Sequence, residues 1–504
     1  MIEIMVDLQG GAKAPLYEKI YGHIRGEIIC GRLLPGEKLP STRLLAGNLA
    51  VSRSTVEMAY HQLLAEGYIK AEPCRGFFVC DITELYQLGI ETPQRTAGRA
   101  AAGGRRGKGA AAAERETAEE RKAADVRIDF SPYAIDTGHF PYNIWRKLYR
   151  NVLLDDGEEL VLSGDGQGDY GLRCAIAVYL HRARGVNCRP EQMVLGAGNE
   201  YLELLLAQIL GSGKKVLMEN PTYLQAYRTF RNAGCEVETV SAGEGGLSED
   251  AVRGKNPDVI YMMPSHQFPM GTVMPFGQRL ALLRWASEAE GRFLIEDDHD
   301  SEYRYRGKPI PALQGQDSSG KVIYLGTFSK SIAPSLRISY MVLPESLAEV
   351  YREKCGFYST TVPRVQQEVL RAFIEEGHFE RHLNRMRGIY RGKHDFLLGE
   401  LKRYGWVRAV GGAHAGLHVL VTAESARTEA ELCRLARERG VQISGLSGYV
   451  VEERREPQKK NADHAAYDGA RSAEQTPAVL LLGYGKPTEQ EIVQGLEILN
   501  EIVN

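Results

Sequence analysis

The sequence of 504 residues lacks long hydrophobic runs, paired cysteines and an excess of charge of either sign. No stretch of eighteen apolar residues occurs, which excludes a membrane-spanning helix. Residues 1–9 have no cationic stretch followed by an apolar core, so we expect no signal peptide and a cytoplasmic location. The eight cysteines include no C-x-x-C pair, which argues against a zinc or redox motif and predicts reduced thiols.

The charge of the chain gives little indication of a nucleic-acid partner. The formal net charge is −3, and the first eighty residues hold nine Lys or Arg against eight Asp or Glu. This balance is far from the basic footprint of a strong DNA-binding domain. Any DNA binding must therefore come from a local patch and from two copies acting together.

Two polar stretches divide the sequence. Residues 94–125 contain no large aliphatic or aromatic side chain. Residues 452–476 are polar, and Tyr467 is their one large apolar side chain. Neither stretch can bury enough apolar surface to offset chain entropy. We therefore expect a small domain at 1–80, a flexible linker at 81–125, a large domain at 126–352, and a smaller C-terminal domain at 353–504 with a polar insertion at 452–476.

The first eighty residues predict three helices followed by two short strands. Apolar residues recur at helical spacing over 15–30, and Ser41 and Ser52 are good N-caps for two further helices. Gly67 is expected to end the third helix. Residues 68–70 and 77–79 are β-prone and flank a turn at 75–76. This order is typical of a winged helix-turn-helix.

In such a domain the third helix presents its N-terminal residues to the major groove. Arginine can contact guanine or phosphate, and hydroxyl groups at a helix N-terminus suit phosphate. Taken singly, an arginine of this kind is more often an ordinary solvated charge. The candidate DNA contacts are Arg43, Ser52, Arg53, Ser54, Thr55, Arg75 and Gly76.

The string GRLLPGEKLPSTRLLAGNLAVSRSTVEMAYHQLLAEGYI resembles the DNA-binding domain of the GntR family over nearly its full length. The P-G-x-x-L-P-S-T-R and S-R-x-T-V pieces fall at that family's spacing. The resemblance implies a double-stranded DNA operator as partner.

The rest of the chain alternates helical patterns with short apolar runs. These runs lie at 193–195, 215–218, 259–262, 292–295 and 322–325. Strands alternating with helices predict an α/β fold with a mostly parallel sheet covered on both faces.

A lysine follows the last of these runs in the sequence VIYLGTFSKSIAPSLR. Lys330 at a strand end, beside small hydroxylated residues, suits a Schiff base with a phosphorylated aldehyde. Arg337 can clamp a phosphate bidentately. A Ser-Lys pair alone carries no such meaning, because most lie on the surface.

A second apolar run leads directly into an acidic stretch, Glu296-Asp297-Asp298-His299-Asp300. A carboxylate at this strand end is what a pyridinium nitrogen needs, because the anion keeps the ring protonated. The alternatives are a solvated acidic turn or a cation site that includes His299. No further ligand pattern supports a metal, and we expect none.

Together these pieces resemble fold-type I aminotransferases, and specifically the MocR/GabR-type regulators, which join a winged helix to an aminotransferase-like domain through a long linker. The resemblance implies a bound pyridoxal 5'-phosphate, with Lys330 forming the internal aldimine and Asp297 pairing with the pyridine nitrogen. Thr327, Ser329 and Arg337 match the phosphate-binding segment.

Further matches come from other segments. Gly198 and Asn199 in VLGAGNEYLELL match a loop whose backbone N–H groups meet the phosphate. Tyr223 in ENPTY matches the aromatic residue that stacks on the ring. His266 and Gln267 in PSHQFPMG lie, by the same resemblance, near the phenolic oxygen.

The sequence also departs from the family pattern. His299 stands where a tyrosine usually contacts the phenolic oxygen, and Gln225 where related members carry an arginine. The final strand at 479–484 lacks the arginine that pairs a substrate carboxylate, and residues 163–168 lack a tyrosine that reaches the neighbouring subunit. Arg454, Arg455 or Arg471 in the insertion are possible substitutes for the missing arginine.

These departures predict a sensor with at most weak transaminase activity. We expect a homodimeric transcription regulator that senses pyridoxal phosphate itself, or an amine or amino-acid effector, and shifts conformation on binding. The alternatives are a working aminotransferase with a DNA-binding appendage and a regulator that has lost the cofactor.

Overall fold

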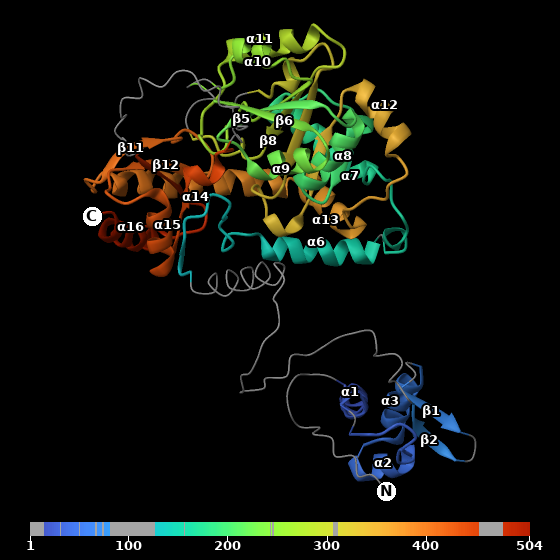
Figure 1. Ribbon diagram of the computed structural model, residues 1–504. Coiled ribbons are helices and arrows are strands. Elements are labelled where there is room, and N and C mark those ends of the chain that lie inside the picture. Colours follow the sequence, from blue (N-terminus) through green and yellow to red (C-terminus); the bar gives the residue numbers. More distant parts are fainter. Residues whose placement is uncertain are drawn as a thin grey trace, which may run out of the picture. The chain divides into compact units, whose positions relative to one another are not determined.

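The computed structural model describes residues 15–80, 126–452 and 477–504, apart from residues 31, 50, 66–67, 73–74, 156, 242, 244–245 and 306–310. The expected linker at 81–125, all but the first residue of the expected insertion, and Gly67 lie outside the described residues. The chain divides into two compact units, Met1–Gly107 and Lys108–Asn504, which are described separately (Figure 1).

The described residues of the N-terminal unit form three helices and an antiparallel hairpin, as the sequence predicts. Its elements are α1 (Leu16–Ile29), α2 (Thr42–Leu49), α3 (Arg53–Ala65), β1 (Ile69–Glu72) and β2 (Gly76–Val79). Ile20 and Ile24 on α1 pack with Leu45, Val56 and Leu63 in one core. The two strands pair from Ile69 with Val79 to Glu72 with Gly76.

The body is built on a seven-stranded sheet in the order β4-β10-β9-β8-β7-β5-β6. All the strands are parallel except β10, which is antiparallel to both its neighbours. The five apolar runs that the sequence marks as strands are confirmed as β4, β5, β7, β8 and β9. The strands are β4 (Met193–Gly196), β5 (Lys215–Asn220), β6 (Glu236–Ser241), β7 (Val259–Met262), β8 (Phe293–Asp298), β9 (Val322–Thr327) and β10 (Ser339–Val342).

Successive residues of each strand point to opposite faces of the sheet, and helices cover both faces. On one face Ile295 and Ile323 pack in a core with α8, α9 and α12. On the other face Leu294 packs with α10 and α11, and Tyr324 packs with α6, α7 and α13. The helices are α6 (Tyr142–Asp155), α7 (Tyr170–Arg184), α8 (Asn199–Leu210), α9 (Leu224–Asn232), α10 (Glu249–Lys255), α11 (Phe276–Ser287), α12 (Glu345–Lys354) and α13 (Arg364–Glu375).

A smaller subdomain follows, with an antiparallel sheet in the order β11-β12-β15-β14. Its helices pack against this sheet in a further core. Its elements are α14 (His378–Leu401), β11 (Val407–Gly411), β12 (His418–Ala423), α15 (Glu429–Glu438), β13 (Val441–Gln442), β14 (Ser444–Gly445), β15 (Ala478–Gly483) and α16 (Glu489–Val503). Short 3-10 helices are η1 (Glu159–Val161), η2 (Pro190–Gln192), η3 (Gln314–Gln316), η4 (Pro334–Leu336) and η5 (Leu446–Tyr449).

The packing of the body joins segments on both sides of residue 352 and places residues 128–130 in the small subdomain. Residue 352 lies inside α12, and Phe373 on the following helix packs with Trp145 in the core of the large sheet. At the other end, β3 (Ile128–Asp129) pairs with β13, and Phe130 belongs to the core of the small subdomain. The body therefore starts in the small subdomain, builds the large sheet, and returns to the small subdomain along α14.

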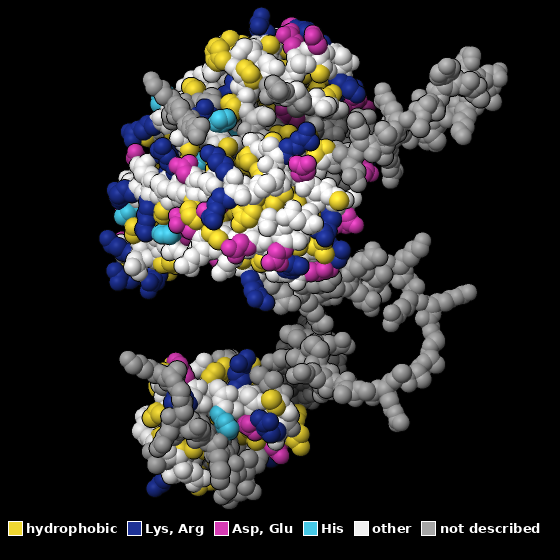
Figure 2. All heavy atoms as spheres, turned by 90° about the vertical axis from the view of Figure 1, so that its left-hand side faces the viewer, with side chains coloured by type: hydrophobic (Ala, Val, Ile, Leu, Met, Phe, Trp, Pro, Cys, Tyr) yellow, Lys and Arg dark blue, Asp and Glu magenta, His cyan; other side chains and the backbone are white. Residues whose placement is uncertain are grey.

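Within the parts of the chain that the structure describes, no helix combines the length and apolarity needed to cross a membrane. Basic and acidic side chains are interspersed on the faces visible in Figure 2. This mixture agrees with the near-neutral formal charge of the chain.

Candidate functional site

The N-terminus of α3 carries the expected DNA-reading residues in an exposed cap. The Oγ atom of Ser52 accepts a hydrogen bond from the backbone N–H of Thr55 at 3.2 Å and lies 2.9 Å from the hydroxyl of Ser54. Arg53 begins the helix, and its side chain is 65% exposed beside Glu57. A surface ion pair of this kind contributes little energy, so Arg53 is available to another partner.

The hairpin carries a second group of candidate DNA contacts. Arg75 pairs with Glu72 at 2.6 Å and stacks over Phe78, and Gly76 takes a φ of +109° at the turn. Arg43 is exposed on α2. All seven candidates therefore lie in the N-terminal unit, on α2, the start of α3 and the hairpin.

The expected cofactor residues meet at the carboxyl ends of the parallel strands. There they surround a cavity of about 160 Å³. In an open α/β sheet, this edge is where ligands bind. The lining residues are Tyr133, Asn199, Glu200, Tyr223, Met263, Phe268, Asp297, His299, Thr327, Ser329, Lys330, Pro334 and Arg337.

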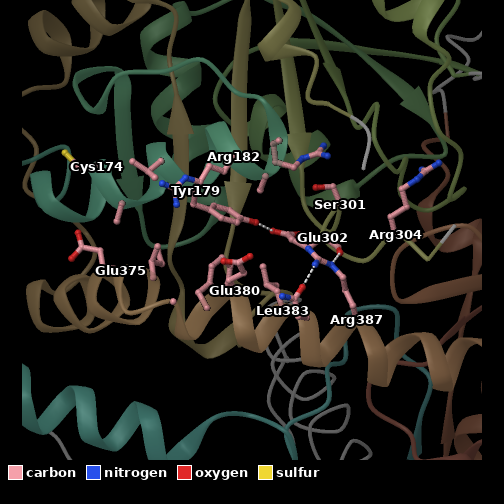
Figure 3. A pocket seen from close by; sticks show the side chains of 18 residues that line it. Cys174, Tyr179, Arg182, Ser301, Glu302, Arg304, Glu375, Glu380, Leu383 and Arg387 are labelled. Carbon is pink, nitrogen blue, oxygen red and sulfur yellow. Dashed lines mark hydrogen bonds between the residues drawn. The ribbon is translucent and has the colours of Figure 1, made fainter. Parts of the chain in front are cut away.

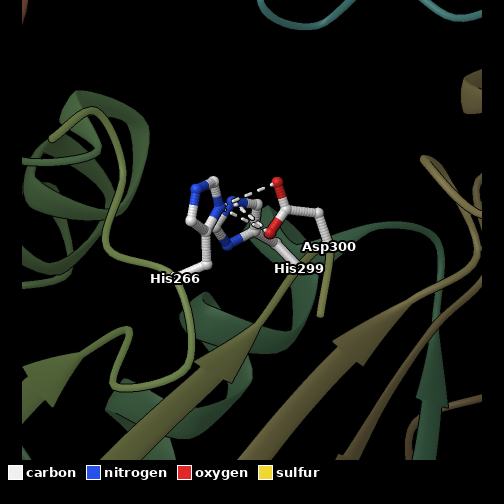
Figure 4. Close-up of side chains that lie close together, drawn as sticks. All are labelled: His266, His299 and Asp300. Carbon is white, nitrogen blue, oxygen red and sulfur yellow. Dashed lines mark hydrogen bonds and ion pairs between the residues drawn. The ribbon is translucent and has the colours of Figure 1, made fainter. Parts of the chain in front are cut away.

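The amine of Lys330 points into a buried cluster of imidazoles and one carboxylate. Its Nζ atom lies 3.6 Å from Asp300, has no hydrogen-bond partner, and sits over the ring of Phe268. Asp300 also contacts His266 at 2.9 Å and His299 at 3.3 Å (Figure 4). Burial alone would raise the pKa of Asp300, but the charges of these three partners outweigh it and hold the pKa well below its usual range.

The same cluster bears on the alternative of a cation site. Ligand atoms of His266, His299 and Asp300 lie within 4.8 Å of one another. The ammonium group of Lys330 already faces the only carboxylate among these three residues. The arrangement is thus explained by the lysine without a metal ion, and the absence of a metal stays a prediction.

Asp297 also lines the cavity and is buried, with 3% of its surface exposed. It accepts a hydrogen bond from the hydroxyl of Tyr261, and the amide of Asn199 lies 3.4 Å from its other oxygen. Burial raises the pKa of Asp297, while His299 and Lys330 oppose that rise. A cationic ring nitrogen placed beside Asp297 would favour the carboxylate form further.

Hydroxyl groups and one arginine also line the cavity. The hydroxyl of Thr327 lies 3.0 Å from that of Ser329 and 2.9 Å from that of Ser339. Arg337 has a φ of +51° and pairs with Glu200 at 2.6 Å. This group of donors at a helix start suits a phosphate, which would compete with Glu200 for the guanidinium.

Gly198, the N-cap of α8, leaves no room for a side chain. Its φ is +102°, and a Cβ atom there would lie 1.9 Å from Nη2 of Arg337. We expect Gly198→Ala to weaken the binding of pyridoxal phosphate at least about tenfold in an absorbance titration, because the arginine must move. Gly211 at the other end of α8 is a matched control: its φ is +96°, but a Cβ atom would meet open space. If Gly211→Ala weakens binding equally, backbone strain rather than displacement of Arg337 is responsible.

Not every expected residue lines the cavity. His266 acts from behind through Asp300, and Gln267 donates to the carbonyl of Pro221 and accepts from the N–H of Met270, holding its own loop. Gly198 shapes the wall through Arg337. Gln225 is exposed on α9 and is absent from the lining.

Several cavity residues were missed by sequence reasoning. Tyr133, Glu200, Met263, Phe268 and Pro334 line the cavity, and Asp300 pairs with the lysine. Glu200, Phe268, Asp300 and Pro334 lie inside the sequence motifs described above and could have been singled out from them. Tyr133 lies far from every motif, and no local signal marks it.

His418 on β12 packs beside His266, and its burial predicts that stability depends on pH. It is fully buried, its Nε2 atom lies 2.9 Å from the carbonyl of Pro269, and its ring lies 5.7 Å from that of His266. Burial lowers the pKa of His418 to about 3. The folded state therefore holds this imidazole neutral, whereas the unfolded chain protonates it below pH 6.5.

The free energy of unfolding should therefore decrease as the pH falls from 6.5 toward 3, because the unfolded chain takes up a proton at His418 that the folded state excludes. The loss is on the order of 1.4 kcal/mol per pH unit. Thermal unfolding of the wild type and of His418→Gln, whose amide can still donate to Pro269, measures it. The wild type should lose more stability than the variant over this interval. Equal slopes would show that His418 is not the titrating group.

Comparison with known proteins matches each of the two units to a family. The family described as bacterial regulatory proteins, gntR family, matches residues 16–79, and the family aminotransferase class I and II matches residues 128–455. The HTH-type transcriptional regulator YhdI of Bacillus subtilis is 36% identical over 500 residues, covering 99% of this chain and 98% of the relative.

Two further similar proteins are a regulator and an aminotransferase of known structure. MocR of Rhizobium meliloti, named as a rhizopine catabolism regulatory protein, is 33% identical over 88% of this chain and 89% of its own length. The crystal structure of LysN, an alpha-aminoadipate aminotransferase of Thermus thermophilus complexed with N-(5'-phosphopyridoxyl)-L-leucine, has a TM-score of 0.63. It is 25% identical and covers 76% of this chain and 94% of LysN.

Proposed function

This chain belongs to the MocR-type regulators, in which a GntR-family winged helix is joined to an aminotransferase class I and II domain, and we propose that its body holds pyridoxal 5'-phosphate on Lys330 and controls DNA binding. The winged helix binds operator DNA through Arg53 and its neighbours. The body acts as the sensing domain. We further propose a cytoplasmic homodimer, so that two winged helices read two half-sites.

The observation that carries the proposal is the unsatisfied amine of Lys330. Its Nζ atom is buried and has no hydrogen-bond partner, although Asp300 lies 3.6 Å away, and a buried polar atom without such a partner is costly unless a ligand supplies one. The groups around it fit pyridoxal phosphate: Asp297 for the ring nitrogen, Tyr223 for the ring face, and Thr327 with Arg337 for the phosphate.

When bound, pyridoxal phosphate supplies an aldehyde that bonds to an amine and a ring that withdraws electrons. The chain's own residues bind and orient it. Asp297, fixed by Tyr261, holds a proton on the ring nitrogen by electrostatic attraction. His299 lies beside Lys330 and Asp300, where its imidazole can donate or accept a proton.

We propose that the effector is pyridoxal phosphate itself or an amine or amino acid that reacts with it. A sensor fits better than an efficient enzyme because no arginine occupies β15 or position 225, where substrate carboxylates are expected to pair. An effector shifts the regulator only by binding one conformation better than the other.

An absorbance titration of the full-length protein with pyridoxal phosphate tests the proposal. We expect a visible band that saturates at one cofactor per chain, and a changed affinity for a DNA duplex that the protein has selected from a random-sequence pool. A protein that stays colourless would refute cofactor binding. Turnover of amino acids and 2-oxo acids above roughly 1 s⁻¹ would favour a working aminotransferase instead.

A further inference from the structure

A second, larger cavity lies in the body, between α7, the start of α14 and the segment that follows β8. Its volume is about 750 Å³, within the usual range for small-molecule sites. Its walls include Ser301 and Glu302, whereas Asp297 and His299, a few residues earlier, line the cofactor cavity. The two cavities therefore share one segment of chain but no lining residue.

The floor of this second cavity is apolar. Val178 on α7 and Phe379 and Leu383 on α14 contribute side chains, and the ring of Tyr179 packs against Phe379 with centroids 5.0 Å apart. Such a surface suits a large aliphatic or aromatic group.

Arginine and glutamate side chains also line the cavity, next to this apolar surface. Glu302 is held by the hydroxyl of Tyr179 at 3.2 Å, and Nε of Arg387 donates to the backbone carbonyl of Glu302 at 2.7 Å (Figure 3). Burial, followed by repulsion from Asp298, raises the pKa of Glu302 to about 7. A cation placed beside Glu302 would stabilise its carboxylate form and so lower its pKa.

Several of the lining charges have no internal counter-ion. Across the described parts of the chain, no ion pair forms at Arg182, Glu302, Glu380 or Arg387. Arg184 and Glu375, in contrast, are engaged by Asp298 and Arg371. A ligand with one positive and one negative group would complement both unpaired signs.

We propose that this cavity binds a free α-amino acid with a large apolar side chain, without covalent chemistry. The ammonium group contacts Glu302, the carboxylate contacts Arg387, and the side chain packs on Val178, Phe379 and Leu383. A simple amine or a simple carboxylic acid satisfies only half of these contacts.

The cavity is connected to the cofactor site by direct contacts. Arg184, which lines the second cavity, pairs at 2.7 Å with Asp298, the neighbour of Asp297. Tyr303, the neighbour of Glu302, donates from its hydroxyl to the backbone carbonyl of Lys330 at 3.2 Å. A ligand bound beside Glu302 is therefore connected through these contacts to both Asp297 and Lys330 in the cofactor site. This consequence, unlike the binding itself, rests on the proposed function.

Calorimetry on the cofactor-free, full-length protein tests the binding. We expect L-phenylalanine to bind at least about tenfold more tightly than phenethylamine or 3-phenylpropionate, each of which lacks one charged group. Glu302→Gln keeps the size of the side chain and should lower the affinity for L-phenylalanine by a similar factor, as should Arg387→Gln. Glu400→Gln removes a carboxylate that Arg403 engages near the other end of α14, outside the cavity lining, and should bind like the wild type.

Equal affinity for the three probes, or an unchanged affinity in Glu302→Gln, would overturn the proposal. A crystal grown with 4-bromo-L-phenylalanine should place bromine in this cavity, and bromine found only beside Lys330 would also overturn it. Because these measurements need no pyridoxal phosphate, they can succeed even if the protein stays colourless, so the failures of the two proposals are distinguishable.

The connection is measured with pyridoxine 5'-phosphate, which lacks the aldehyde and cannot react with an amine. Its affinity for the cofactor cavity should change when L-phenylalanine is saturating, and L-phenylalanine affinity should change by the same factor in return. An unchanged affinity would show that the second site is not coupled to the first.

Discussion

Lys330→Ala will remove the visible absorbance of the protein with pyridoxal phosphate and abolish the response of DNA binding to the effector. The variant loses the one amine that faces Asp300 inside the cavity. Without that amine the protein cannot bond covalently to the cofactor, so retention falls to the noncovalent contacts of Asp297, Tyr223, Thr327 and Arg337. DNA affinity without effector should remain, because the winged helix has its own core.

The measurements are absorbance spectra and DNA-binding titrations with and without pyridoxal phosphate. Lys402→Ala is the control, because this exposed lysine lies at the end of α14, away from the cavity. A Lys330→Ala protein that still responds to effector like the wild type would show that sensing does not depend on this bond.

Arg53→Ala will lower the affinity for operator DNA by about 1–3 kcal/mol, or roughly five- to 150-fold, and leave pyridoxal phosphate binding unchanged. Arg53 starts α3, where its guanidinium can reach a base edge or a phosphate. Its pairing with Glu57 is exposed, so losing that pair should barely affect the stability of the domain. Binding isotherms at several salt concentrations separate the two contacts. A phosphate contact reduces the salt slope by about one, and a base contact relaxes specificity at one position.

Arg434→Ala provides the matched control for this prediction. Arg434 forms the same i,i+4 pair, with Glu438, on an exposed face of α15 in the body. It should leave both DNA and cofactor affinity unchanged. If Arg53→Ala and Arg434→Ala lower DNA affinity alike, the effect reflects overall charge and not groove recognition.

Much of the fold followed from local patterns in the sequence. The spacing of Ile20, Ile24 and Ile28 indicated α1, and runs of β-branched and aliphatic residues indicated β4, β5, β7, β8 and β9. These patterns are readable because a helix or a buried strand imposes its period on consecutive residues. The antiparallel β10 was not anticipated, since strand direction depends on pairing between distant segments.

Sequence by itself determined the two halves of the protein and the chemical type of its central residues: a recognition helix with Arg53, a lysine after β9 and a carboxylate after the core of β8. These signals are local, since each depends on residues adjacent in the chain. Tertiary structure alone decided that Asp300 faces Lys330, that Tyr261 fixes Asp297, and that Glu302 and Arg387 share a second cavity. Those contacts join residues on separate elements, and only packing of the elements brings them within bonding distance.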